Sequence, residues 1–304
     1  MNVVLFMFLT VVWGSAYVAI HMVIQHYPPI FAAALRVGLG LLILLGIAWR
    51  AIFRARIGAS ERWWGLLTGV LIMGVAWSAL FWGQQYIAPA IAAIVIAATP
   101  TLTALMLPLF DRAAIVRGRQ WGGVVTGFVG ILFVFSPQWL QQPTGELKGL
   151  SAVLLTAVAY AVATCLLQTR LHRVPGRPTF FWQSLGALLF LLAVSAGLES
   201  WPPPRTLLQV TDVNLILLYL GLFPSTLAFL IALHLIRVWG GVATMSVTFT
   251  APLVALLIDA VWLRQIPAWP VLIGAVIIFF GTYLVHDPAR RPPIIRRNVC
   301  SNAL

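Results

Sequence analysis

Long runs of apolar residues, separated by short polar stretches, recur along the whole chain. A helix that crosses the hydrocarbon core of a bilayer needs about 20 such residues. Ten runs reach or approach this length, at residues 3 to 24, 29 to 49, 63 to 83, 87 to 109, 120 to 136, 149 to 167, 179 to 197, 214 to 235, 242 to 263 and 268 to 285. The pattern predicts an all-α integral membrane protein with ten transmembrane helices.

The composition agrees with this prediction and changes how the net charge is interpreted. Hydrophobic residues make up 61% of the chain and charged residues 9%, against about a quarter charged in soluble domains. If the loops alternate sides, fifteen basic residues fall on one side and only Lys148, Arg205 and Arg264 on the other, with Arg36 inside a span. By the positive-inside rule, the richer side and both termini are cytoplasmic. The net charge of +12 therefore reflects topology, and we expect no nucleic-acid binding.

Two apolar segments in the two halves of the chain share one design. Residues 90 to 110 and 242 to 262 each carry a proline near the middle, and Pro252 follows Pro100 by 152 positions. A proline at mid-helix leaves the carbonyl four residues earlier without its donor, which a membrane tolerates only where protein or a water-filled cavity satisfies that group. Two broken helices at equivalent places are typical of a transport site between inverted repeats.

Further matches support a duplication. A glycine pair in span five matches one in span ten at an offset of 151, and a polar and aromatic stripe in span one matches one in span six at an offset of 147. The matched sets are Gly123 and Gly130 with Gly274 and Gly281, and Trp13, Tyr17 and His21 with Tyr160, Thr164 and Gln168. Because each half has an odd number of spans, the second copy must be inverted. We expect two five-helix repeats, residues 1–136 and 149–285, and a basic cytoplasmic tail, residues 286–304.

A family resemblance rests on Trp13-Gly14-Ser15 in the first span, on Pro29 and Arg36 in the second, and on the prolines and small residues of spans four and nine. These features resemble the EamA family of the drug/metabolite transporter superfamily, over nearly the whole chain. The resemblance implies a ten-helix inverted-repeat carrier that moves small metabolites across the bacterial inner membrane, usually outward. Two positions depart from the family pattern, with His21 where a lysine is frequent and Gln265 where an acidic residue is frequent.

Aromatic and hydroxyl side chains within the spans are the candidates for substrate binding. Residues four apart share a helical face, so Trp13 and Tyr17 form one stripe and Tyr160 and Thr164 another. Tryptophan and tyrosine also form interfacial belts, but Trp13 and Tyr160 lie half-way through their spans. The other candidates are Trp77, Trp82, His234 and Thr248. For His234, a structural role near the cytoplasmic end is as well supported as a ligand role.

Two ionisable residues within the spans need an explanation. An unpaired Arg36 would cost at least about 2.5 kcal/mol in the membrane, so it must bind a substrate carboxylate, loose backbone carbonyls or Asp259. We favour a structural role, because the resemblance places an arginine here across many substrates. Asp259 is the only carboxylate within a span and the leading acid for proton coupling, although we expect it to snorkel to the interface. Together with Pro100 and Pro252, these residues form the structural and gating set.

An aromatic, hydroxyl-lined cavity with few charges favours export of a small metabolite, such as an amino acid or an amino-acid derivative. Efflux of drugs or dyes is the alternative if the cavity is wholly aromatic, and a diphosphate substrate would need more cations. An intramembrane enzyme or a non-transporting membrane protein is the alternative from a different class. His21, His234 and Asp259 lie on different spans and no HExxH spacing occurs, so we expect no catalytic residue, metal or cofactor. The expected partners are a small-molecule substrate and the lipid bilayer, and a homodimer stays open.

Overall fold

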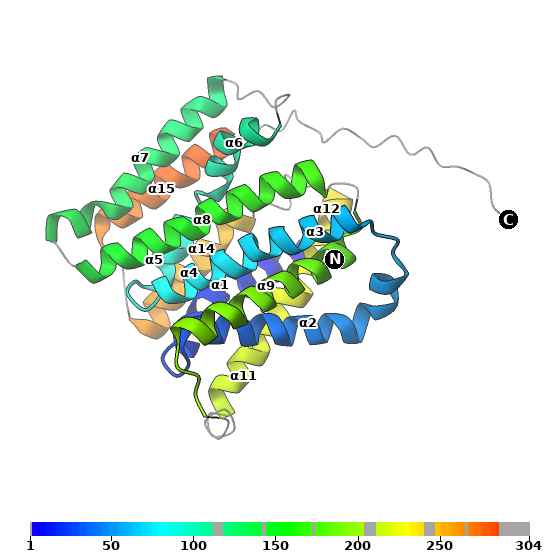
Figure 1. The fold of residues 1–304 in the computed structure, drawn as a ribbon. Helices are drawn as coiled ribbons and strands as arrows, with labels where there is room; N and C mark the ends of the chain where they lie inside the picture. Colours follow the sequence, from blue (N-terminus) through cyan, green and yellow to red (C-terminus); the bar gives the residue numbers. More distant parts are fainter. Residues whose placement is uncertain are drawn as a thin grey trace.

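The computed structural model describes residues 2–111, 118–141, 144–171, 174–203, 211–239, 247–264 and 267–285, and this part of the chain is helical without a strand (Figure 1). Eight helices are long and apolar enough to cross a membrane, and Thr250–Trp262 and Trp269–Leu284 are shorter apolar helices. The predicted all-α membrane class is therefore confirmed. The basic tail predicted for residues 286–304 lies outside the described residues.

The helices follow the apolar runs closely, and several spans consist of more than one element. The first half contains α1 (Asn2–Val23), α2 (Pro29–Arg54), α3 (Ala59–Gly69), η1 (Val70–Val75), α4 (Ala76–Gly83), α5 (Pro89–Ile96), α6 (Thr99–Phe110) and α7 (Gly118–Gln141), where η marks a π-helix. The second half contains α8 (Thr144–Arg170), α9 (Gly176–Leu198), α11 (Thr211–Leu220), η2 (Gly221–Leu227), α12 (Ala228–Trp239), α14 (Val247–Ile258), η3 (Asp259–Leu263) and α15 (Trp269–Val285). Prolines begin α2 and α5, where the missing N–H costs nothing.

Two π-helices lie inside the third and the eighth apolar run, in η1 and η2. Gly221, the first residue of η2, follows Val70, the first residue of η1, by 151 positions. This is the same offset that relates the glycine pairs of spans five and ten. Single π-helical turns inside α-helices are rare and occur mostly at functional sites. Both halves of the chain therefore carry the same backbone irregularity at matching positions.

The helix that was predicted to break near Pro100 does so. α5 ends at Ile96, α6 begins at Thr99, and Pro100 occupies the first turn of α6. The Ile96 carbonyl accepts a hydrogen bond of 2.6 Å from the Thr99 hydroxyl, and the Ala97 carbonyl accepts one of 3.2 Å from Thr282 of α15. Side-chain hydroxyls thus satisfy the carbonyl groups that the break releases.

The second break, predicted at Pro252, is absent, and that prediction was wrong. α14 continues through Pro252 as a helix. A proline removes only the hydrogen bond of its own nitrogen, here the one to the Thr248 carbonyl, so the helix can continue on both sides of the missing bond. The irregular backbone of this span lies nearer its end, where η3 begins at Asp259.

Contacts between the halves come in matched pairs. α2 packs against α9 and α7 against α15, so each of these spans contacts the equivalent span of the other half (Figure 1). α3 packs on α9 as η2 packs on α2, and α6 packs on α8 as α14 packs on α1. Several contacts between helices therefore recur with the halves exchanged.

The glycine pairs lie where α7 and α15 touch. A Cβ atom built on Gly130 would lie 2.9 Å from the Gly274 carbonyl oxygen, and one built on Gly281 would lie 2.7 Å from the Gly123 carbonyl oxygen. A side chain of any size would therefore push the two backbones apart, which explains the glycines. Since Gly130 corresponds to Gly281 and Gly123 to Gly274, these two contacts are also exchanged copies of each other.

Candidate functional site

A cluster of polar and aromatic side chains in the interior of the bundle is centred on Arg36 of α2. This side chain is only 5% exposed. Its Nε donates a hydrogen bond of 3.0 Å to the Ser225 hydroxyl in η2, and its guanidinium carbon lies 3.9 Å from the centre of the Trp77 ring in α4. A guanidinium over an indole face is stabilised by the ring quadrupole. Both irregular spans, three and eight, thus contribute to the position of Arg36.

Three tyrosines complete what we call the central cluster, which consists of Tyr17, Arg36, Trp77, Tyr160, Tyr219 and Ser225. The Trp77 indole N–H donates a hydrogen bond of 2.8 Å to the Tyr160 hydroxyl. Tyr17, Tyr160 and Tyr219 all interact electrostatically with Arg36. The Tyr219 hydroxyl also hydrogen-bonds the Ser15 hydroxyl, at 2.7 Å. The cluster combines one positive charge with several hydroxyls and aromatic faces, and it draws on both halves of the chain.

Trp13 lies one helical turn from Tyr17 and contacts the second π-helix. Its indole N–H donates a hydrogen bond of 3.2 Å to the carbonyl of Pro224, which lies inside η2. Trp13 therefore borders the central cluster through its contact with η2, next to Ser225.

Other predicted binding residues lie elsewhere. Trp82 is 37% exposed, and its ring packs against Tyr86 at 4.9 Å. Thr164 is half-buried in α8. Thr156, which begins the same stripe, donates a hydrogen bond of 2.9 Å to the Ala76 carbonyl and so packs against α4. Thr248 lies in α14, and its side chain falls outside the described residues.

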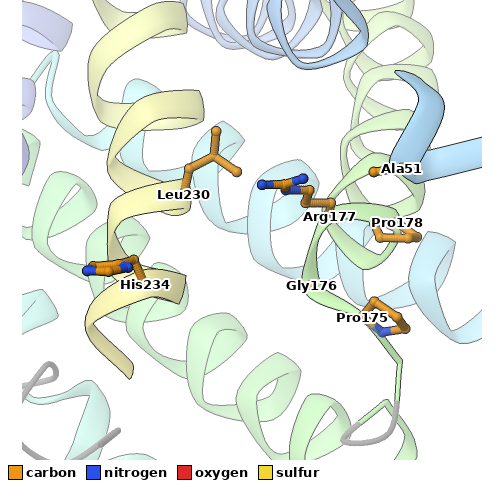
Figure 2. Close-up of a pocket in the computed structure, with 7 residues that line it drawn as sticks. All are labelled: Ala51, Pro175, Gly176, Arg177, Pro178, Leu230 and His234. Atoms are coloured by element: carbon orange, nitrogen blue, oxygen red, sulfur yellow. The ribbon is translucent and has the colours of Figure 1, made fainter. Parts of the chain in front are cut away.

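His234 lines a separate pocket at one end of the bundle, far along α12 from the central cluster. The pocket has a volume of about 380 Å³. Its lining residues are Ala51, Pro175, Gly176, Arg177, Pro178, Leu230 and His234. Figure 2 shows the Arg177 side chain extending from the start of α9 toward the helix that carries Leu230 and His234. This is the end of the bundle that the basic loops predict to be cytoplasmic.

The opposite end is closed by carboxylates of the second half that cap helices of the first half. The Glu199 carboxylate accepts hydrogen bonds of 2.8 Å from the backbone N–H groups of both Ile30 and Phe31, at the start of α2. The Ser195 hydroxyl donates a third hydrogen bond to it, at 2.8 Å. Tyr27 adds a further bridge to Asn214, at 2.8 Å. These contacts hold the two halves together at this end.

Asp259 forms the second cap, and the expectation that it would snorkel was wrong. Its side chain is fully buried, and Oδ2 accepts a hydrogen bond of 2.7 Å from the Ala90 N–H in the first turn of α5. The partial positive charge of a helix N-terminus stabilises a carboxylate there, while Oδ1 of Asp259 is buried without a hydrogen-bond partner among the described residues. Arg36 and Asp259 have separate partners, and the structure shows no ion pair between these two residues.

Sequence reasoning missed Tyr219 and Glu199 and gave Ser225 little weight. Tyr219 carries the same signal as Tyr160, an aromatic hydroxyl inside a span. Ser225 directly follows Pro224, so the break and its hydroxyl could have been treated together. Glu199 follows an apolar run directly, but its partners lie 168 and 169 positions away. Among the described residues, no group of His, Cys, Asp and Glu side chains could hold a metal ion.

Comparisons with known proteins identify the family. The model of the EamA-like transporter family matches residues 1–136 and 147–286. Similar curated proteins include the uncharacterized transporter YoaV of Bacillus subtilis, 22% identical over 90% of this chain and 93% of that protein. They also include Protein PecM of Dickeya dadantii, 24% identical over 91% and 89%, and the uncharacterized inner membrane transporter YedA of Escherichia coli K12, 26% identical over 82% and 79%.

A solved crystal structure shares the fold. It has a TM-score of 0.61 and 17% sequence identity, and the match covers 93% of this chain and 95% of that one. The family match spans most of the chain in two segments, and the relatives are named as transporters over most of their own length. The expectation that the chain is not an enzyme follows from this family. The chain is a membrane transporter that belongs to the EamA-like transporter family.

Proposed function

We propose that the chain is a secondary transporter of the bacterial inner membrane that exports a small metabolite, such as an amino acid or an amino-acid derivative, by alternating access. The observation that carries this proposal is the central cluster, in which Arg36 is held among aromatic hydroxyls by spans of both halves. Such a mixture of apolar faces and a few polar groups suits an amphipathic solute. The relative YedA is named an inner membrane transporter, which supports the location.

Residues 1–136 and 149–285 act as two inverted five-helix repeats in this proposal. Three independent observations support the inversion. The contact pairs between helices recur with the halves exchanged, the glycine contacts of α7 and α15 recur in the same way, and η1 and η2 share one offset. An approximate two-fold axis relating the halves produces such reciprocity. Substrate sites of inverted-repeat carriers lie at the boundary between the repeats, where the central cluster lies.

Alternating access needs one end of the pathway to be closed while the other is open. The carboxylate caps of Glu199 and Asp259 join the halves at the end predicted to be outside. The pocket beside Arg177 and His234 lies at the end predicted to be cytoplasmic. This asymmetry supports an inward-facing conformation. Release of the two caps would then open the outer end.

Drug or dye efflux is the nearest alternative. It requires a cavity that is wholly aromatic, because a hydrophobic solute cannot replace the hydrogen bonds of buried polar groups. The charge of Arg36 and the hydroxyls of Tyr160 and Tyr219 favour a polar solute instead. A dye-efflux assay separates the two functions directly.

The test is metabolite profiling of the culture medium of cells with and without the protein, followed by uptake of the enriched solute into everted membrane vesicles. We expect one solute or one chemical class to be enriched by the wild-type protein, and Trp77→Ala to abolish the enrichment. Trp269→Ala is the matched control, because this tryptophan is 72% exposed at the start of α15. Identical metabolite profiles of the two culture media, together with efflux of dyes, would contradict metabolite export.

A further inference from the structure

Arg36 uses only part of its hydrogen-bonding capacity within the protein. A guanidinium has five N–H donors, one on Nε and four on the two terminal nitrogens. Nε donates to Ser225, and one face of the group lies on Trp77. No acceptor among the described residues takes a hydrogen bond from the terminal nitrogens. A buried cation therefore presents four N–H groups that no described residue binds.

The terminal nitrogens are also not sealed inside packed protein. In the described part of the chain, the fully buried side-chain atoms without a partner belong to Gln84 and Asp259, and none belongs to Arg36. The guanidinium end consequently borders accessible space. The tyrosines of the central cluster, Tyr17, Tyr160 and Tyr219, interact electrostatically with this guanidinium.

The structural partners considered for Arg36, which are Asp259 and loose carbonyl groups, are bound by other residues. Asp259 is occupied as the cap of α5. Carbonyl groups at the irregular backbone of η2 are bound by hydroxyls, with Ser225 donating to Leu220 at 2.8 Å and Thr226 donating to Gly221 at 3.1 Å. No loose carbonyl or carboxylate in the described residues is held by Arg36.

We propose that Arg36 binds the carboxylate of the transported solute, and that the substrate class is a small monocarboxylate with an apolar or aromatic body. This inference rests on the proposed function. The two terminal nitrogens bind the two carboxylate oxygens side by side, in the geometry that arginine prefers. The Trp77 ring beside the guanidinium would then contact the apolar body of the solute.

The charge balance of the site favours one negative charge over two. The groups that interact electrostatically with Arg36 are tyrosines, and none of them is a second cation. A phosphate ester or a dicarboxylate would bring a charge that nothing in the described cluster balances. A monocarboxylate neutralises Arg36 and so removes the cost of its burial.

The test uses purified full-length protein in detergent and three acids, 3-phenylpropionate, hexanoate and N-acetyl-L-leucine, each paired with its uncharged amide. Binding is measured by equilibrium dialysis and by the rise in unfolding temperature. We expect at least one acid to bind the wild-type protein and its amide to bind roughly ten- to hundred-fold more weakly, the factor associated with a charged hydrogen-bonding partner. Equal binding of acid and amide, no binding of any acid, or tighter binding of inorganic phosphate would each overturn the inference.

Variants test the residue itself. Arg36→Gln is expected to weaken the acid roughly ten- to hundred-fold and to leave the amide unchanged. Arg50→Gln is the matched control, since Arg50 lies on the same helix over the ring of Trp49 at 5.5 Å and is exposed. If Arg36→Gln does not fold, Arg36→Lys keeps the charge without the paired geometry and should also weaken binding of the acid. If neither variant folds, the comparison of acid and amide binding to the wild-type protein tests the inference.

Transport separates the inference from the function on which it rests. Proteoliposomes that release an acid and its amide at equal rates would refute the carboxylate role of Arg36 and leave metabolite export standing. Binding of the acids that depends on Arg36, without any release of acid from proteoliposomes, would leave the site standing and refute the carrier.

Discussion

Asp259 and Ala90 lie 169 positions apart, and the carboxylate of the first accepts a hydrogen bond of 2.7 Å from the backbone N–H of the second. The residue that precedes α5, Ala88, offers no side-chain cap of its own. The second half of the chain thus supplies the missing cap for a helix of the first half. This cap lies at the end of the bundle where Glu199 performs the same task for α2.

Removal of this cap should lower stability. We expect Asp259→Ala to reduce the free energy of unfolding by about 1–3 kcal/mol, because the buried N–H of Ala90 then has no acceptor. Asp259→Asn keeps an acceptor oxygen and should lose less. Asp212→Ala is the control, an exposed acid in the first turn of α11. Denaturant unfolding in detergent measures all three, and an Asp259→Ala protein as stable as the Asp212→Ala control would refute the cap.

The Glu199 cap should control local opening of the outer end. In Glu199→Ala the N–H groups of Ile30 and Phe31 lose their common acceptor, so their exchange with deuterium should accelerate. Hydrogen exchange followed by mass spectrometry on a peptide that begins at Pro28 measures this effect. A peptide from α7 should keep its exchange rate. Unchanged exchange at the start of α2 would contradict the Glu199 cap.

The hydrogen bond between Trp77 and Tyr160 should appear as a coupling energy. Trp77→Phe and Tyr160→Phe each remove it, so the double variant should lose less stability than the two single effects combined. The expected coupling is about 0.5–1.5 kcal/mol, the net contribution of one hydrogen bond. The unfolding free energies of the wild-type protein, the two single variants and the double variant form a double-mutant cycle. Strictly additive effects would show that the 2.8 Å contact contributes nothing.

The glycine contact between α7 and α15 should tolerate no methyl group. Gly130→Ala places a Cβ atom 2.9 Å from the Gly274 carbonyl oxygen, so we expect a loss of about 1–3 kcal/mol from overpacking. Gly122→Ala on the same helix has nothing within 4 Å and should be neutral or slightly stabilising, because alanine favours helix. The melting temperatures of the Gly130→Ala and Gly122→Ala proteins in thermal unfolding compare the two effects. Equal melting temperatures would exclude close approach of the backbones.

The predicted topology can be tested with single cysteines. Gln25→Cys replaces an exposed residue in the connection after α1, and Ser60→Cys replaces one in the first turn of α3. In a background without Cys165 and Cys300, a membrane-impermeant thiol reagent added to intact cells should label Gln25→Cys alone. Everted vesicles should show the reverse. Labelling of both from one side would reject the alternation of loops.

Much of the fold could be predicted because apolar length and proline position act locally. The ten apolar runs coincide with helical elements, and the break at Pro100 follows from the missing N–H of proline. Pro252 shows the limit of that rule, since the same residue type leaves α14 continuous. Neighbouring hydroxyls and the packing around a proline decide between a break and a continuous helix.

The site was less predictable, because its contacts join residues far apart in the chain. The sequence placed Arg36, Trp77 and Tyr160 inside spans, but their pairing depends on how α2, α4 and α8 pack. Asp259 is the clearest case. Its distance from the span end favoured snorkelling, whereas the start of α5 offers it a partner within the bundle.

The matched π-helices η1 and η2 bear on how the bundle could move. Their hydrogen bonds join residues five apart instead of four, so each holds one residue more than an α-helical segment of the same height. A segment that relaxed to the α form would turn everything beyond it by about 100°. At η1 that rotation would swing the Trp77 ring off the guanidinium of Arg36, and at η2 it would carry Ser225 away from the same group. The extra residue in each half would therefore allow a helix rotation beside Arg36, the single buried cation of the central cluster.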